Sequence, residues 1–130
     1  MIIDTCEAMS LFDQVEAPNL ILMGTSLVGK SAYSHQFRPD VNNYLNDHFS
    51  YEFYVDLEKG RLNDKTKVQD LKTIYPQSRI NSDVDFKTTL TGRKFGDVLL
   101  SEFLPLGRVQ ADGVRQFNLS ELNEETVLIQ

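Results

Sequence analysis

The hydrophobic and polar positions of the N-terminal part of the chain predict short helices around one buried strand. Apolar residues at helical spacing predict an amphipathic helix over residues 5–16, which ends before Pro18. The continuous apolar run over residues 20–23 is typical of a strand that is covered on both faces. A glycine-bounded turn over residues 24–29 then leads into an expected short helix over residues 30–37.

The next two segments differ in their hydrophobic period. Residues 41–49 carry an apolar stripe at helical spacing, which predicts a helix capped by Asp40. Residues 50–57 alternate between apolar and polar positions, which predicts a strand. From residue 19 to residue 60 the predicted order is strand, helix, helix, strand. We expect the two strands of such a crossover unit to lie parallel.

The second half of the chain shows shorter and more varied patterns. A modest helix is predicted over residues 68–75, followed by a polar loop over residues 77–83. Residues 84–90 alternate and predict a half-exposed strand. Residues 95–104 fit a buried strand or a helix equally well. The dipeptide Asp112-Gly113 is typical of a tight hairpin turn.

Together these elements predict a fold of class α+β or α/β. It has an N-terminal strand–helix–strand unit followed by a hairpin-rich C-terminal half. At 130 residues the chain has the length of one small domain, residues 1–130. The polar stretch over residues 76–83 is a candidate boundary within it.

Composition and charge restrict the classes of function. A hydrophobic content of 41% with 25% charged residues is ordinary for a globular protein. Nineteen acidic and thirteen basic residues give a net charge of −6. Because no basic surplus is present to displace counterions, we expect no nucleic-acid partner.

The termini and the cysteine content bear on location. Cys6 is the only cysteine, so no disulfide can form within the chain. The N-terminus lacks the basic and apolar regions of a secretory signal, and no apolar run is long enough to span a bilayer. The sequence therefore predicts a cytoplasmic protein without a membrane span.

The glycine-bounded turn matches a phosphate-binding loop. Gly24, Gly29, Lys30 and Ser31 stand at the Walker A spacing, with a strand before them and an expected helix after them. In such a loop, backbone N–H groups and the lysine bind phosphates and the hydroxyl binds magnesium. One hypothesis is therefore a P-loop nucleotide-binding protein that takes ATP or GTP with Mg²⁺. The later Asp-x-x-Gly and Asn-Lys-x-Asp motifs of GTPases are missing.

The same turn also supports a second interpretation. The segments LILMGTS, SAYSHQF, VNNYLNDHF and EFYVDLEKG follow one another between Leu20 and Gly60, within a stretch that covers about residues 12–60. In this order they resemble SGNH hydrolase-like domains, in particular the bacterial O-acetyltransferases of alginate-type polysaccharides. The resemblance implies that Ser26 is the nucleophile and that Gly60 contributes to the oxyanion hole.

The base of such a site is not evident. The family uses an Asp-x-His pair, which this sequence lacks. Of the two histidines, His48 lies on the apolar stripe of its predicted helix, which leaves His35 as the candidate base. The resemblance therefore implies an SGNH-like module for carbohydrate O-acetyl transfer or ester hydrolysis, incomplete or inactive as an isolated chain. A processed piece of such a protein would be periplasmic.

A non-catalytic protein-binding module is the remaining alternative, such as an inhibitor, an immunity factor or an assembly adaptor. Small size, acidity and the missing base all agree with it, so we expect a protein partner. One cysteine and two histidines at unrelated spacing make no zinc motif. We expect no metal site, and no cofactor unless the P-loop hypothesis holds.

Overall fold

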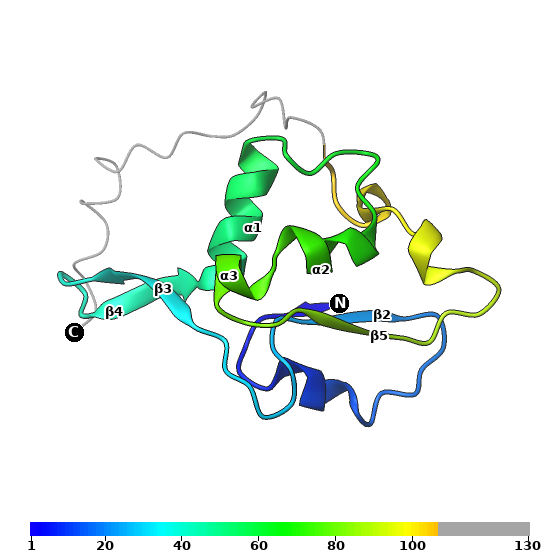
Figure 1. The fold of residues 1–130 in the computed structure, drawn as a ribbon, viewed down its shortest axis with the longest axis horizontal. Coiled ribbons are helices and arrows are strands. Elements are labelled where there is room, and N and C mark those ends of the chain that lie inside the picture. Colours follow the sequence, from blue (N-terminus) through cyan, green and yellow to red (C-terminus); the bar gives the residue numbers. More distant parts are fainter. Residues whose placement is uncertain (107–130) are drawn as a thin grey trace, which may run out of the picture.

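A three-stranded sheet and a layer of short helices form the body of the molecule, and a separate hairpin projects from it (Figure 1). The computed structural model describes residues 1–106. The sheet order is β1 (Ile2–Ile3), β2 (Ile21–Gly24) and β5 (Asp85–Thr88). β1 runs parallel to β2, and β5 runs antiparallel to it.

One face of the sheet is covered by helices. These are α1 (His48–Glu58), the 3-10 helix η2 (Val68–Asp70), α2 (Leu71–Ile74) and α3 (Gln77–Ile80). Two further 3-10 helices, η3 (Phe95–Asp97) and η4 (Leu100–Glu102), follow β5. Met23 of β2 is buried in the same core cluster as Phe49 and Phe53 of α1. The ring of Tyr75 lies edge-on to Phe49, with 5.1 Å between centroids.

The other face of the sheet is covered by the 3-10 helix η1 (Ala8–Phe12). Because side chains alternate along a strand, Leu22 lies on the face opposite Met23. Leu22, Ala8 and Phe12 are all buried. Lys87 of β5 donates from Nζ to the Phe12 carbonyl at 2.6 Å, which fixes the end of η1 to the sheet. β2 is therefore covered on both faces, as its apolar run predicted.

The projecting hairpin consists of β3 (Ser34–Arg38) and β4 (Asn43–Asp47), which pair antiparallel. The rings of Phe37 and Tyr44 are in edge contact across the two strands, 5.2 Å apart. Both side chains are nevertheless about half exposed, at 48% and 53%. The apolar residues of this segment therefore stabilise the hairpin and do not belong to the core.

The structure confirms the mixed α and β class and several of the predicted elements. The predicted strands at residues 20–23 and 84–90 are β2 and β5, and the predicted helix at residues 68–75 is η2 with α2. The helix predicted for residues 5–16 is only the short η1. The ambiguous segment, residues 95–104, contains η3 and η4.

The predictions for residues 30–57 are wrong. The helices expected at residues 30–37 and 41–49 are largely replaced by the hairpin, and the strand expected at residues 50–57 belongs to α1. The buried residues of α1 stand at helical spacing: Phe49, Phe53 and Asp56. The sequence of residues 50–57 therefore fits both a helical buried face and the alternation of a strand. Packing of the helical face against the rest of the core stabilises the helix.

The predicted topology is also corrected. β2 pairs in parallel with β1, not with a strand near residue 57, so the crossover unit predicted for residues 19–60 is not formed. The polar loop expected at residues 77–83 contains α3. The hairpin predicted at Asp112-Gly113 lies outside the described residues.

A buried charge cluster joins α1 to the α2–α3 segment. Asp56 is 1% exposed and accepts hydrogen bonds from Arg79, Arg61 and Tyr75 at 2.9, 3.0 and 3.0 Å. Arg79 also donates to Glu52 at 2.6 Å. Burial acts to raise the pKa of Asp56, but its three donors outweigh burial and hold that pKa below its usual value.

We expect Asp56→Ala to lower the free energy of unfolding by about 3–5 kcal/mol, because it leaves the Arg79 guanidinium without its buried partner. Urea denaturation at neutral pH measures the effect. Asp40→Ala is the matched control, since it removes an exposed ion pair with Arg38 and should leave the midpoint nearly unchanged.

The same variant has an expected pH dependence. Because the pKa of Asp56 is lower in the folded state, its stabilisation is complete above about pH 4 and is lost as the pH falls further. The stability difference between wild type and Asp56→Ala should therefore shrink in acid. A difference that stays constant down to pH 2.5 would contradict the assignment.

Candidate functional site

Ser26 lies in the turn after β2, and its hydroxyl is fully engaged. The residue is 0% exposed. Its Oγ donates to the Thr5 carbonyl at 2.6 Å and accepts from the Ala8 N–H at 3.0 Å. Within residues 1–106 no imidazole is hydrogen-bonded to Ser26. A substrate therefore has no path to this hydroxyl, and its geometry is that of a structural bridge.

Gly60 and His35 are also engaged elsewhere. Gly60 ends α1 with a left-handed φ of 63°, and its N–H donates to the Leu57 carbonyl at 3.1 Å. This donor is thus unavailable to an oxyanion. The His35 ring stacks on His48, with 4.4 Å between centroids and 11° between planes. Among the described residues, Ser26, Gly60 and His35 share no hydrogen bond.

The Walker A residues do not form a phosphate loop. Gly24 belongs to β2 and pairs with Asp85 of β5. The Lys30 N–H donates to the Leu27 carbonyl at 3.0 Å, and the chain continues into β3. No helix begins at Ser31, so the helix N-terminus that such a loop directs at phosphate is missing. The geometry of Gly24, Gly29, Lys30 and Ser31 is therefore not that of a phosphate-binding loop.

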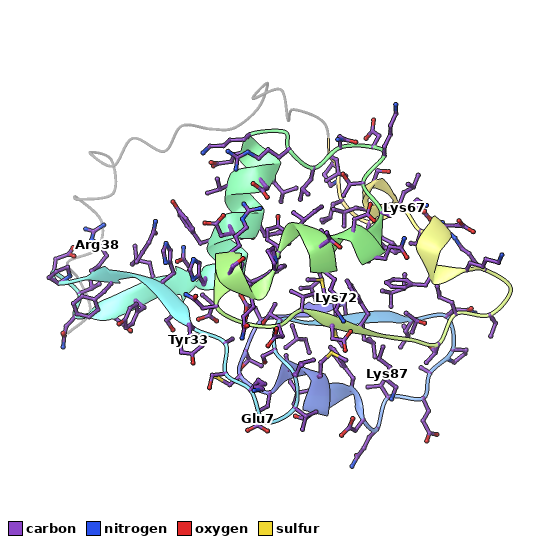
Figure 2. All side chains as sticks on the ribbon, viewed as in Figure 1. Glu7, Tyr33, Arg38, Lys67, Lys72 and Lys87 are labelled. Atoms are coloured by element: carbon purple, nitrogen blue, oxygen red, sulfur yellow. The ribbon has the colours of Figure 1, made fainter. Side chains whose placement is uncertain are left out.

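Cys6 occupies the exposed turn that follows β1. Its thiol is free and exposed and donates to the Ala32 carbonyl at 3.4 Å. The next residue, Glu7, has a left-handed φ of 53° and lies at the surface of this turn (Figure 2). The Glu7 N–H donates to the Lys30 carbonyl at 2.9 Å, which holds the turn against the loop after β2. In the described part of the chain the Cys6 N–H has no acceptor.

Asp4 ties this turn to the rest of the fold. Its carboxylate accepts from Thr25 Oγ1 at 2.6 Å, and from both Oγ and N–H of Ser50 at 2.6 and 3.1 Å. Thr25 follows β2, and Ser50 lies in the first turn of α1. The carboxylate therefore joins the ends of both parallel strands to the helix.

Sequence reasoning considered Cys6 only for disulfides and for a zinc motif. A signal was nevertheless present, because an apolar pair, Ile2 and Ile3, precedes Asp4 and the lone thiol. A single cysteine of this kind is a candidate nucleophile. Within residues 1–106 no three His, Cys, Asp or Glu side chains are grouped so that they could hold a metal ion.

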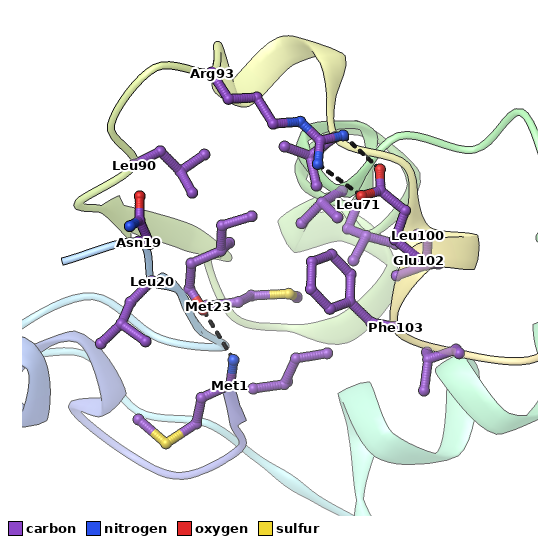
Figure 3. A pocket seen from close by; sticks show the side chains of 15 residues that line it. Met1, Asn19, Leu20, Met23, Leu71, Leu90, Arg93, Leu100, Glu102 and Phe103 are labelled. Carbon is purple, nitrogen blue, oxygen red and sulfur yellow. Dashed lines mark hydrogen bonds and ion pairs between the residues drawn. The ribbon is translucent and has the colours of Figure 1, made fainter. Parts of the chain in front are cut away.

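An apolar cavity of about 610 Å³ is lined by residues of β1, β2, α2 and η4 (Figure 3). Among the side chains around it are Met1, Leu71 and Phe103. At its rim Arg93 donates to Glu102 at 2.6 Å. Neither Cys6 nor Ser26 lines this cavity. No helix of the described residues is long and apolar enough to cross a membrane.

Most of the chain is similar to GPI-anchor transamidases. The protein of that name from Schizosaccharomyces pombe is 33% identical over 103 residues, which cover 78% of this chain and 27% of that protein. The Saccharomyces cerevisiae protein is 31% identical over 101 residues, covering 78% and 25%. The Homo sapiens protein is 30% identical over 102 residues, covering 78% and 26%. This chain thus spans about a quarter of the length of these relatives. No protein-family model matches it.

These similarities overturn the family and function predicted from the sequence. The chain is similar to transamidases and not to SGNH-type O-acetyltransferases, so the predicted O-acetyl transfer or ester hydrolysis is wrong. The same similarity goes against the alternatives of a P-loop protein and of an inhibitor, immunity factor or adaptor. The expected cytoplasmic or periplasmic location is wrong as well, because it does not agree with relatives that act on GPI anchors.

The contact between His35 and His48 gives a testable prediction. Burial lowers the pKa of His48, and the nearby His35 lowers it further. NMR titration should therefore give His48 a pKa below the ordinary value of about 6.5. In His35→Ala the pKa should rise toward that value, because the substitution exposes the ring and removes a like charge. An unchanged pKa of His48 in this variant would contradict the stacked arrangement.

Proposed function

We propose that this chain is part of an acyl-transfer domain of the GPI-anchor transamidase type, with Cys6 as the nucleophile. The observation that carries the proposal is the exposed, free thiol at the carboxyl end of β1. Similarity to transamidases over most of the chain supports the reaction type. Ser26, the other nucleophile considered, is buried, and its hydroxyl is bonded to the main chain.

A transamidase exchanges one amide bond for another, which a thiol can accomplish in two steps. The Cys6 thiolate attacks the carbonyl carbon of a substrate amide and forms a tetrahedral oxyanion. The C–N bond then breaks, and the departing amine takes a proton from a general acid, which leaves a thioester on Sγ. A second amine attacks the thioester, loses a proton to the same group acting as a base, and releases the thiolate.

The turn offers a donor for the oxyanion. The Cys6 N–H has no acceptor among residues 1–106, and it belongs to the nucleophile's own residue. The serine proteases use the corresponding N–H of their nucleophile in the oxyanion hole. A donor that is fixed in place before charge develops stabilises the transition state without a cost of reorganisation.

We infer that the proton-transferring group lies outside residues 1–106. In the described part, neither His35 nor His48 is hydrogen-bonded to Cys6 Sγ, and the two rings contact each other. β1 is an edge strand of the described sheet, since only β2 pairs with it. A strand added in parallel beside β1 would end next to Cys6, so the loop after it could supply the group.

The substrate follows from the name of the relatives. A GPI-anchored protein has lost a C-terminal tail at a site of small residues. The amide attacked by Cys6 would be the one that joins this tail, and the second amine would be carried by the anchor. Because the chain spans about a quarter of its relatives, we expect the complete site to require further polypeptide, in the same protein or in a protein partner.

The isolated chain can be tested with an activated acyl donor. p-Nitrophenyl acetate has a leaving group that needs no general acid, so we expect it to acetylate Cys6. Because the turn supplies an oxyanion donor, acetylation should be at least about tenfold faster than that of a peptide of residues 4–8. Mass spectrometry locates the acetyl group, and an added primary amine should remove it as the acetamide.

Cys6→Ser should abolish this fast acetylation. Ser31→Ala, which changes an exposed serine of the neighbouring loop, should leave the rate unchanged. If the folded chain reacts no faster than the peptide, Cys6 is not in an acyl-transfer site and the proposal is wrong.

A further inference from the structure

The Ser26 hydroxyl bridges the two sides of Cys6. It donates to the carbonyl of Thr5, the residue before the cysteine, at 2.6 Å. It also accepts from the N–H of Ala8, two residues after the cysteine, at 3.0 Å. Ser26 and Ala8 are both 0% exposed, so the bond between them is shielded from water. Cys6, whose thiol is exposed, therefore lies in the chain between the two residues that Ser26 holds.

The bond to Thr5 determines the direction of the Cys6 N–H. The Thr5 carbonyl and the Cys6 N–H belong to one peptide group, which is planar and trans. In such a group the C=O and N–H bonds point in opposite directions. Because the carbonyl is directed inward to Ser26, the N–H is directed away from that buried hydroxyl, where no described group accepts it.

The turn needs such a restraint. Glu7 has a φ of 53°, which is uncommon for a residue other than glycine, asparagine or aspartate. Without the bridge, no hydrogen bond among the described residues would hold the Thr5–Cys6 peptide group, whereas the next peptide group is still held through the Glu7 N–H. The hydrogen bond at the Thr5 carbonyl also polarises the peptide and strengthens its N–H as a donor.

We propose that Ser26 is a positioning residue that orients the Thr5–Cys6 peptide so that the Cys6 N–H is fixed as the oxyanion donor. This inference rests on the proposed function of Cys6. Ser26 touches neither the substrate nor the reacting sulfur, and it acts through the peptide group that it holds. The serine that resembled a nucleophile in the sequence thus serves the cysteine beside it.

Two reactions of the same thiol separate this role from a general structural one. Acetylation by p-nitrophenyl acetate passes through an oxyanion, whereas alkylation by iodoacetamide does not. Both depend equally on the thiolate population and on access to Sγ. We expect Ser26→Ala to slow acetylation of Cys6 by about tenfold or more while alkylation changes by less than about twofold, since only acetylation uses the oxyanion donor.

Ser10→Ala is the matched control. Ser10 Oγ also donates to a carbonyl of this turn, that of Glu7 at 2.7 Å, but not to the peptide group of Cys6. Its ratio of acetylation to alkylation should equal that of wild type. Ser26→Thr keeps a hydroxyl and should restore most of the ratio lost in Ser26→Ala.

The outcomes distinguish this inference from the proposed function. If wild-type Cys6 is acetylated rapidly and Ser26→Ala leaves the ratio unchanged, or lowers both rates together, the positioning role is wrong and the nucleophile remains. If wild-type Cys6 is not acetylated faster than the peptide, the proposed function itself fails.

The inference can be tested even if the Ser26→Ala variant does not fold. Circular dichroism shows whether Ser26→Ala folds. Where it does not, the ratio of the two rates in wild type is compared with that in the peptide of residues 4–8, which lacks the bridge. A ratio at least about fivefold higher in the folded chain supports an oriented donor, and an equal ratio overturns the inference.

Discussion

The pairing of β2 on both of its edges is the constraint on which the rest of the structure depends. Leu22 and Met23 are each 1% exposed, because η1 covers one face and the helical layer covers the other. A strand buried in this way must satisfy its backbone groups within the sheet. β5 does so on one edge and β1 on the other, with β1 in parallel. Parallel pairing places the carboxyl ends of β1 and β2 at the same edge of the sheet.

The candidate site is a consequence of that shared edge. The turn after β1 carries Cys6, and the turn after β2 carries Thr25 and Ser26. Their polar groups are paired with one another: Ser26 with the main chain around Cys6, and Thr25 with Asp4. Asp4 also accepts from the first turn of α1, so sheet, helix and thiol-bearing turn are held as one unit. An exposed thiol on a rigid element is the arrangement that nucleophilic chemistry needs.

Sequence patterns predicted the strands in which apolar residues alone mark the buried positions. β2 has a continuous apolar run and β5 has an alternating one, and both are found where they were expected. The segment from residue 30 to residue 57 was assigned wrongly for two physical reasons. The apolar residues of the β3–β4 hairpin are exposed, so their spacing does not indicate which face of the segment packs on the core. In α1 the helical face includes a charged residue, Asp56, whose burial depends on Arg79 from a distant part of the chain. No local pattern contains that partner.

The turn after β2 shows why a motif must be judged by the burial of its polar atoms. Its letters match a phosphate loop and resemble a nucleophile turn, and both interpretations require groups that point into an open site. The Ser26 hydroxyl instead points into the protein, and the Lys30 main chain is hydrogen-bonded within its own loop and to Glu7. The neighbouring turn has the opposite character, with an exposed thiol and an N–H that no described group accepts. A reacting group must be accessible and a supporting group must be bonded. The proposed roles follow this difference: Cys6 as the nucleophile, and Ser26 as the residue that orients its peptide group.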